Sequence, residues 1–154
     1  MTNNDVLRRI RYTFKFDDFK MISIFDLAEY PVPRGLINDW LKKDDDPNFQ
    51  ECSDTHLAIF LNGFINERRG KKEGAQPKPE TQLTNNIIFR KLKIALNLKS
   101  EDILVIIHTA NLRISKHELS ALFRKPDHKH YRECKDQILR KFLTGVQNRY
   151  HKSS

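Results

Sequence analysis

The chain has 154 residues, of which 38% are hydrophobic and 31% are charged, and its formal net charge is +8. This is the composition of a soluble globular protein, and no apolar run approaches the roughly 18 residues that a membrane-spanning helix needs. The N-terminus has no basic region followed by an apolar stretch, as a secretory signal peptide would. We therefore expect a cytoplasmic protein.

The chain contains two copies of one sequence unit. Residues 3–70 align with residues 85–152 without a gap, and both copies contain Glu-Cys-x-Asp and Leu-x-x-Phe-Leu-x-Gly-x-x-Asn. Self-similarity at a fixed spacing indicates a duplicated fold unit. Each copy is near the lower size limit for a self-sufficient core, so we expect the copies to pack on each other. The predicted segments are a first helical repeat over 1–70, a linker over 71–84 and a second, basic helical repeat over 85–152.

The predicted fold is all-α, with two tandem pseudo-symmetric four-helix repeats. The first helix of each copy begins at an asparagine pair, Asn3-Asn4 or Asn85-Asn86, and apolar residues follow at helical spacing. The side-chain oxygen of asparagine can accept a hydrogen bond from a free backbone N–H at a helix start. We therefore expect these asparagines to act as N-caps.

The second and third helices of each copy are separated by a short break. In the first copy the second helix begins at Asp17-Asp18, because the positive end of the helix dipole favours carboxylates. In the second copy Ser115-x-x-Glu118 is a capping-box pattern that starts the third helix. In outline the two helices resemble a helix-turn-helix, but their spacing is about one residue short and no glycine lies in the turn.

The fourth helix of each copy carries a glycine in its middle, Gly63 or Gly145. Glycine inside a helix costs about 1 kcal/mol relative to alanine. Its presence in both copies indicates a close helix–helix approach, although both glycines could also be inherited from the ancestral unit.

The net charge is unevenly distributed. Residues 1–80 hold 13 Lys/Arg and 14 Asp/Glu, giving −1, whereas residues 81–154 hold 15 Lys/Arg and 6 Asp/Glu, giving +9. The basic copy could face an external polyanion, because Arg and Lys neutralise phosphates and release counterions. Alternatively, it could face acidic patches of its sister copy, such as Asp44-Asp45-Asp46.

The basic residues of the second copy are the candidate nucleic-acid-binding residues. Arg and Lys would contact phosphates, and a tyrosine could stack on a base. Solvated helix faces are also commonly charged, so the charge asymmetry rather than any motif supports this hypothesis. The candidates are Arg90, Lys91, Lys93, Arg124, Lys125, Lys129, Tyr131, Arg132, Arg140 and Lys141.

Cys52 and Cys134 occupy equivalent positions, each just before a predicted helix. A thiol at a helix N-terminus can have a lowered pKa, but neighbouring carboxylates oppose thiolate formation. The alternative, which we favour, is that each cysteine is a small buried side chain packed under the corner between the third and fourth helices.

Metal and enzyme signals are poor. His128 and His130 lie near Cys134, and zinc accepts such donors, but the first copy has Asp46 and Asn48 at the histidine positions. A second Cys/His pair at zinc-finger spacing is missing. The sequence has no glycine-rich phosphate loop, nucleophile elbow or His-Glu metal motif. We therefore predict no metal, no cofactor and no enzymatic activity.

Four stretches carry a resemblance to a known family: Asn3–Arg8, Phe60–Gly70, Asn85–Ile88 and Pro126–Gln137. With the repeat spacing, they resemble the YehS-like family of short bacterial proteins, which has a domain of unknown function in two tandem copies. The resemblance covers nearly the whole chain. It implies a cytoplasmic bacterial protein and brings no activity, ligand or catalytic residue.

Three functions remain open at this point. The leading hypothesis is a non-enzymatic binding module whose basic second copy contacts RNA, DNA or the ribosome. The alternative is a protein–protein adaptor that uses the groove between the repeats or an exposed corner at Trp40–Asp46. A thiol-based redox role for the two cysteines is the third.

Overall fold

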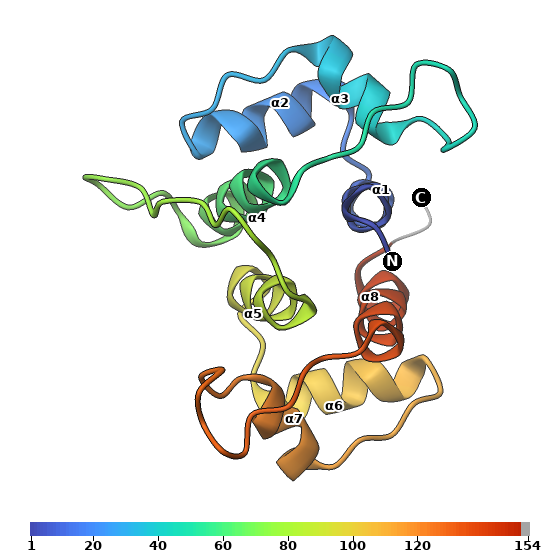
Figure 1. The fold of residues 1–154 in the computed structure, drawn as a ribbon, viewed down its shortest axis with the longest axis vertical. Helices are drawn as coiled ribbons and strands as arrows, with labels where there is room; N and C mark the ends of the chain where they lie inside the picture. The colour runs from blue at the N-terminus through green and yellow to red at the C-terminus, as the bar shows by residue number, and fades with distance from the viewer. Residues whose placement is uncertain (152–154) are drawn as a thin grey trace. The chain divides into compact units, whose positions relative to one another are not determined.

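The computed structural model describes residues 1–151, and over these residues it contains eight α-helices and no strand (Figure 1). The all-α prediction is confirmed, as are the two tandem four-helix repeats. The end of the second repeat, predicted at Lys152, lies outside the described residues. The helices are α1 (Asn3–Phe14), α2 (Asp18–Leu27), α3 (Arg34–Leu41), α4 (Asp54–Arg69), α5 (Asn85–Ala95), α6 (Ser100–Thr109), α7 (Lys116–Leu122) and α8 (Asp136–Tyr150).

The chain divides into two compact units, the first over Met1–Leu83 and the second from Thr84 onward. Residues 71–83 of the predicted linker therefore group with the first unit, and two side-chain contacts explain why. The Asn66 amide donates a 2.9 Å hydrogen bond to Gln76 Oε1, and the backbone N–H of Leu83 donates to Asp54 Oδ2 at 2.8 Å. Both contacts join the segment to residues of α4. That the two units pack on each other stays a prediction.

The asparagine pairs are not the N-caps, so that prediction is wrong. Thr2 and Thr84, one residue earlier, take this position, and their hydroxyls accept from the N–H groups of Asp5 at 3.0 Å and Ile87 at 3.2 Å. A threonine caps a helix start well because its hydroxyl reaches the free N–H groups of the first turn. The asparagines lie inside the first turn, where their side chains are free to reach other elements.

The predicted starts of α2 and α7 are confirmed. Asp17 is the N-cap of α2 and accepts a 2.8 Å bond from the N–H of Lys20. Ser115 and Glu118 form the expected capping box at the start of α7, with both bonds at 3.0 Å. These signals are local in sequence, and the structure follows them.

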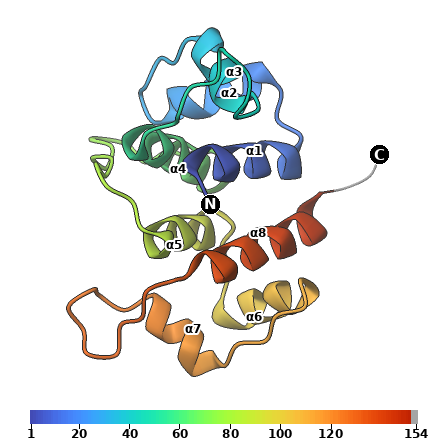
Figure 2. The ribbon, with the colours of Figure 1, turned by 45° about the vertical axis from the view of Figure 1, so that its right-hand side comes forward.

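Close helix packing organises each unit. In both ribbon views α2 lies against α4, and α6 lies against α8 (Figures 1 and 2). A Cβ atom built on Gly63 would lie 2.0 Å from the carbonyl oxygen of Ile24, and one on Gly145 would lie 2.1 Å from that of Ile106. Ile24 and Ile106 are themselves equivalent positions of the repeat. The prediction of close helix–helix approach at both glycines is therefore confirmed.

Each unit has an aromatic core of its own. In the first unit the Phe25 ring contacts both Trp40 and Phe60, and in the second Phe89 stacks on Phe142 with 4.2 Å between centroids. Trp40 is only 1% exposed. The prediction of an exposed corner is thus wrong at Trp40, because α3 turns this side chain inward, whereas Lys43, Asp44 and Asp45 that follow are exposed.

Substituting either packed glycine should destabilise the protein, whereas a third helical glycine serves as the control. Gly63→Ala or Gly145→Ala places a methyl group on a backbone carbonyl that cannot move without separating two helices. We expect a loss of about 1–3 kcal/mol or more, the usual range for overpacking, measured by urea unfolding. Gly35→Ala, on α3 with no atom within 4 Å of its new Cβ, should be neutral or slightly stabilising. Equal effects at all three glycines would contradict the packing account.

Candidate nucleic-acid interface

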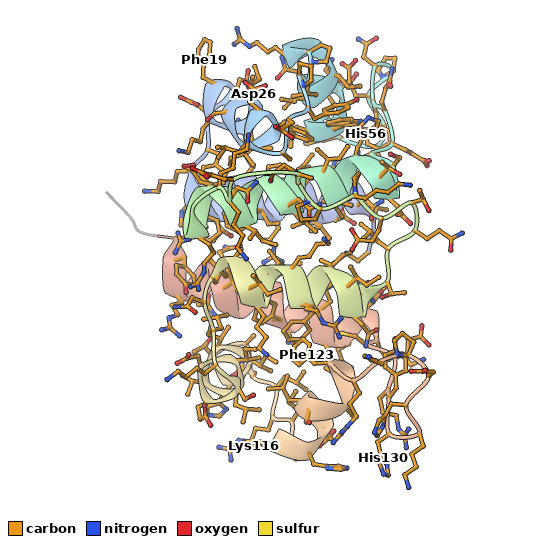
Figure 3. The ribbon with its side chains drawn as sticks, turned by 90° about the vertical axis from the view of Figure 1, so that its left-hand side faces the viewer. Phe19, Asp26, His56, Lys116, Phe123 and His130 are labelled. Atoms are coloured by element: carbon orange, nitrogen blue, oxygen red, sulfur yellow. The ribbon has the colours of Figure 1, made fainter. Side chains whose placement is uncertain are left out.

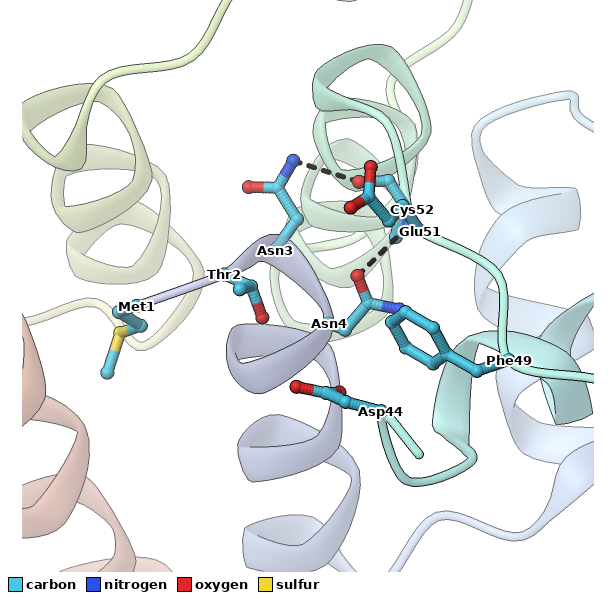
Figure 4. A pocket seen from close by; sticks show the side chains of 8 residues that line it. All are labelled: Met1, Thr2, Asn3, Asn4, Asp44, Phe49, Glu51 and Cys52. Atoms are coloured by element: carbon cyan, nitrogen blue, oxygen red, sulfur yellow. Dashed lines mark hydrogen bonds between the residues drawn. The ribbon is translucent and has the colours of Figure 1, made fainter. Parts of the chain in front are cut away.

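A buried asparagine amide fixes the segment that follows the third helix of the first unit. The Asn4 Nδ2 group donates to the carbonyl oxygens of Trp40 at 2.9 Å and Gln50 at 2.8 Å. Its Oδ1 atom accepts from the N–H of Cys52 at 3.0 Å, as Figure 4 shows. One side chain therefore joins α1, the end of α3 and the approach to α4. All its partners are backbone atoms.

The second unit repeats this arrangement with Asn86. The amide donates to the carbonyl oxygens of Leu122 and Arg132, both at 2.9 Å, and accepts from the N–H of Cys134 at 2.9 Å. The preceding asparagines also match. Asn3 and Asn85 each donate to the carbonyl oxygen of the nearby cysteine at 3.0 Å and to the carboxylate that opens the fourth helix.

These amides hold two loops of matching backbone. We call residues 42–53 the acidic loop and residues 124–135 the basic loop. In the acidic loop, the N–H of Asp46 bonds to the oxygen of Lys43 at 3.0 Å. In the basic loop, the N–H of His128 bonds to the oxygen of Lys125 at 2.9 Å. A second turn follows in each loop, from Phe49 to Asp46 and from Tyr131 to His128.

The two loops differ in charge although their backbones match. The acidic loop holds two lysines and four carboxylates, for a net charge of −2. The basic loop holds five Lys/Arg and two carboxylates, for a net charge of +3, together with two histidines. One scaffold thus presents opposite charge in the two units.

Five predicted site residues belong to the basic loop, and four of them are cations. Lys125, Lys129 and Arg132 are exposed, and within the described part of the chain no carboxylate forms an ion pair with any of them. Arg124 is half-buried, and its Nε atom is buried with no hydrogen-bond partner among the described residues. The loop therefore presents at least three cations whose charge is not neutralised locally.

Tyr131 is half-buried in the same loop. Its backbone N–H and carbonyl oxygen are both engaged, the first by His128 and the second by the Arg132 guanidinium at 2.9 Å. Because part of the ring is covered, stacking on a base is less favoured than contact between the loop cations and phosphates.

Predicted residues on α5 hold the base of the basic loop. Arg90 donates a 2.8 Å bond to the carbonyl oxygen of Phe123, just as Arg8 in the first unit donates to that of Lys42 at 2.6 Å. The Lys93 ammonium lies 4.7 Å from the centroid of the Phe123 ring, within cation–π range. Both residues therefore have structural contacts. Lys91 is half-buried.

The last two predicted residues lie on α8. Arg140 is exposed, one turn after the helix start that follows the basic loop, whereas Lys141 is half-buried. Arg140 is thus accessible to solvent, whereas Lys141 is less accessible. Hydrogen bonds to its carboxylate lower the pKa of Asp136, and the charge of Arg140 acts in the same direction.

Two residues in or near the basic loop, Lys135 and His117, were not among the predicted site residues. Lys135, the last loop residue, is exposed and lies 3.4 Å from Glu133. The ring centroid of His117 on α7 lies 6.5 Å from that of His130, which is labelled in Figure 3. The His130 centroid lies 5.5 Å from that of His128. Over the described residues, no group of three His, Cys, Asp or Glu side chains could hold a metal ion. The sequence contained one signal for Lys135: its counterpart in the first unit, Ser53, is uncharged.

In the first unit a serine, a histidine and a tyrosine are linked by hydrogen bonds, and such a set of residues also occurs in catalytic sites. His56 contacts Ser53 Oγ through Nδ1 at 2.8 Å and Tyr30 OH through Nε2 at 2.9 Å. Ser53 is also the N-cap of α4, its oxygen accepting from the N–H of His56. The imidazole packs 4.9 Å from Trp40, and burial lowers the pKa of His56. Capping and aromatic packing account for these contacts.

Both cysteines are buried, Cys52 at 4% and Cys134 at 1% exposure. Burial raises the pKa of each thiol to about 12, with nearby carboxylates acting in the same direction. Thiolate is the reactive form in redox chemistry, so this environment weighs against a thiol-based role. It favours the interpretation of a small side chain packed beneath the loop.

The comparisons with known proteins give a family without an assigned activity. The family model described as "Protein of unknown function (DUF1456)" matches residues 3–70 and 85–151, one match in each unit. The chain belongs to this family. It is 44% identical over 152 residues to "Uncharacterized protein YehS" of Escherichia coli strain K12, covering 98% of this chain and 97% of that protein. No solved structure matches. Within the described residues, none of the helices has the length and apolar character to cross a membrane.

The buried thiols predict a loss of stability at alkaline pH. An unfolded cysteine has a pKa near 8.5, well below the value of about 12 in the folded protein. As pH rises past about 8.5 the unfolded chain therefore releases its thiol protons first, and the free energy of unfolding falls until about pH 12. Urea unfolding at a series of pH values should show this decline. The Cys52→Ala, Cys134→Ala double variant should show a shallower one; an unchanged slope would contradict the burial of the thiols.

Proposed function

We propose that this protein is a non-enzymatic binding module that contacts RNA, DNA or the ribosome through phosphate groups, using the basic loop of its second unit. One observation carries the proposal: the same loop scaffold has a net charge of −2 in the first unit and +3 in the second. The fold does not require the cations, because the first unit builds the loop without most of them.

The geometry of the loop favours phosphate contact over base reading. Lys125, Lys129 and Arg132 lie within eight residues and are exposed, so their charges can approach one polyanion together. Each phosphate that a cation neutralises releases counterions from the nucleic acid, which provides the free energy of binding. The half-buried Tyr131 offers little surface for stacking. Binding would therefore depend weakly on sequence and strongly on salt.

The proposal places the protein in the cytoplasm, where nucleic acids and ribosomes are found. Buried thiols agree with this location, since a reducing compartment keeps cysteines as thiols.

Removing the loop cations should weaken nucleic-acid binding. Fluorescence anisotropy with labelled single-stranded RNA, duplex RNA and duplex DNA would measure affinity at several salt concentrations. The triple variant Lys125→Ala, Lys129→Ala, Arg132→Ala should lose at least about tenfold in affinity near 100 mM salt. On duplex DNA, the slope of log affinity against log salt should fall in magnitude by about 2 to 3, because three phosphate contacts are lost.

A matched control removes the same charge from the first unit. Lys43, Lys72 and Lys78 are all exposed, so Lys43→Ala, Lys72→Ala, Lys78→Ala changes the net charge equally and should leave affinity and slope near the wild-type values. Equal losses in both variants would mean that only total charge matters. No wild-type binding at about 50–100 mM salt would end the proposal.

A further inference from the structure

The two most exposed large hydrophobic side chains of the described residues lie on different units. Phe19 is 70% exposed on α2, and Val105 is 63% exposed on α6. Their repeat counterparts are polar: Glu101 corresponds to Phe19, and Ser23 corresponds to Val105. Each unit therefore presents one apolar feature that the other lacks.

Val105 of α6 lines two hollows, one of which also contacts α8. The first has a volume of about 340 Å³ and the second, which contacts α8, about 420 Å³. Leu104 and Ile114 provide apolar walls in the first hollow, where Arg113 is exposed. Ile106 lines the second hollow, where Arg149 is exposed and Asp102 also contributes a carboxylate. Within the described part of the chain, neither arginine forms an ion pair with a carboxylate. The surface fits an apolar group flanked by negative charge.

Phe19 has these properties. It projects outward at the start of α2, as Figure 3 shows, directly after Asp17 and Asp18. The Asp17 side chain is exposed and caps α2, and Asp18 forms a 3.0 Å ion pair with Arg34, whose guanidinium also lies 5.5 Å from the centre of the Phe19 ring. The ring is thus held in an outward position beside the Asp17 carboxylate and the ion pair of Asp18 with Arg34.

We propose that the Val105 surface of one molecule binds Phe19 of a second copy of this chain. The contact would remove both side chains from water, and the carboxylates before Phe19 would approach Arg113 and Arg149. Each contact uses Phe19 of one molecule and Val105 of another, so a two-fold dimer holds two such contacts, whereas a dimer with a single contact can add further chains.

Sedimentation velocity over a wide concentration range tests the proposal with the full chain. The weight-average mass of the wild type should rise above 18.3 kDa, the mass of one chain, as concentration increases. Phe19→Ala or Val105→Lys should each weaken self-association at least about tenfold, because each removes a central contact. Tyr12→Ala, at another exposed aromatic residue (54%), is the control and should behave as the wild type.

Mixing the two variants gives the sharpest result. Phe19→Ala keeps an intact Val105 surface, and Val105→Lys keeps an intact Phe19, so an equimolar mixture should form dimers and nothing larger. Three results would overturn the proposal: a wild type that stays monomeric at all concentrations, self-association that neither variant reduces, or a mixture in which no dimer forms. Circular dichroism of each variant establishes that it is folded before its mass is interpreted.

Discussion

The buried amide of Asn4, repeated as Asn86, determines the geometry of each unit. Each amide uses both of its N–H groups and its oxygen on three backbone groups that come from the end of one helix and the approach to another. An unsatisfied buried amide is costly, so these bonds fix the path of the intervening loop strongly. Because the partners are backbone atoms, the loop side chains are free to differ.

Other residues shared by the two copies support the same framework. Arg8 and Arg90 bind carbonyl groups at the end of the third helix. Gly63 and Gly145 permit the close contact between the second and fourth helices. Asn66 and Asn148 reach back to the carbonyl groups at the end of the second helix. Residues identical in both copies thus build the unit, and the differing residues of the loops and outer helix faces are free to serve function.

Local signals in the sequence predicted much of this structure. The helix order, the capping box at Ser115 and the glycine contacts followed from short patterns and from the repeat itself. The roles of Asn4 and Arg90 could not be predicted, because their partners lie more than 30 residues away in the chain. The threonine caps were within reach, since Thr2 and Thr84 also correspond in the repeat, but the asparagines after them are equally good cap residues. Of the candidate site, the loop cations were identified from charge, whereas their shared, backbone-anchored loop came from the structure.

The central claim is that one backbone framework carries interchangeable loops and that the charge of the second loop provides binding. The most direct test replaces residues 124–133 with residues 42–51, a segment of equal length, and measures both thermal unfolding and nucleic-acid affinity. Our account predicts a folded chain with a melting temperature within a few degrees of the wild type and an affinity at least about tenfold lower. A chain that fails to fold would contradict the interchangeable framework. A folded chain with undiminished affinity would contradict the assignment of binding to the loop.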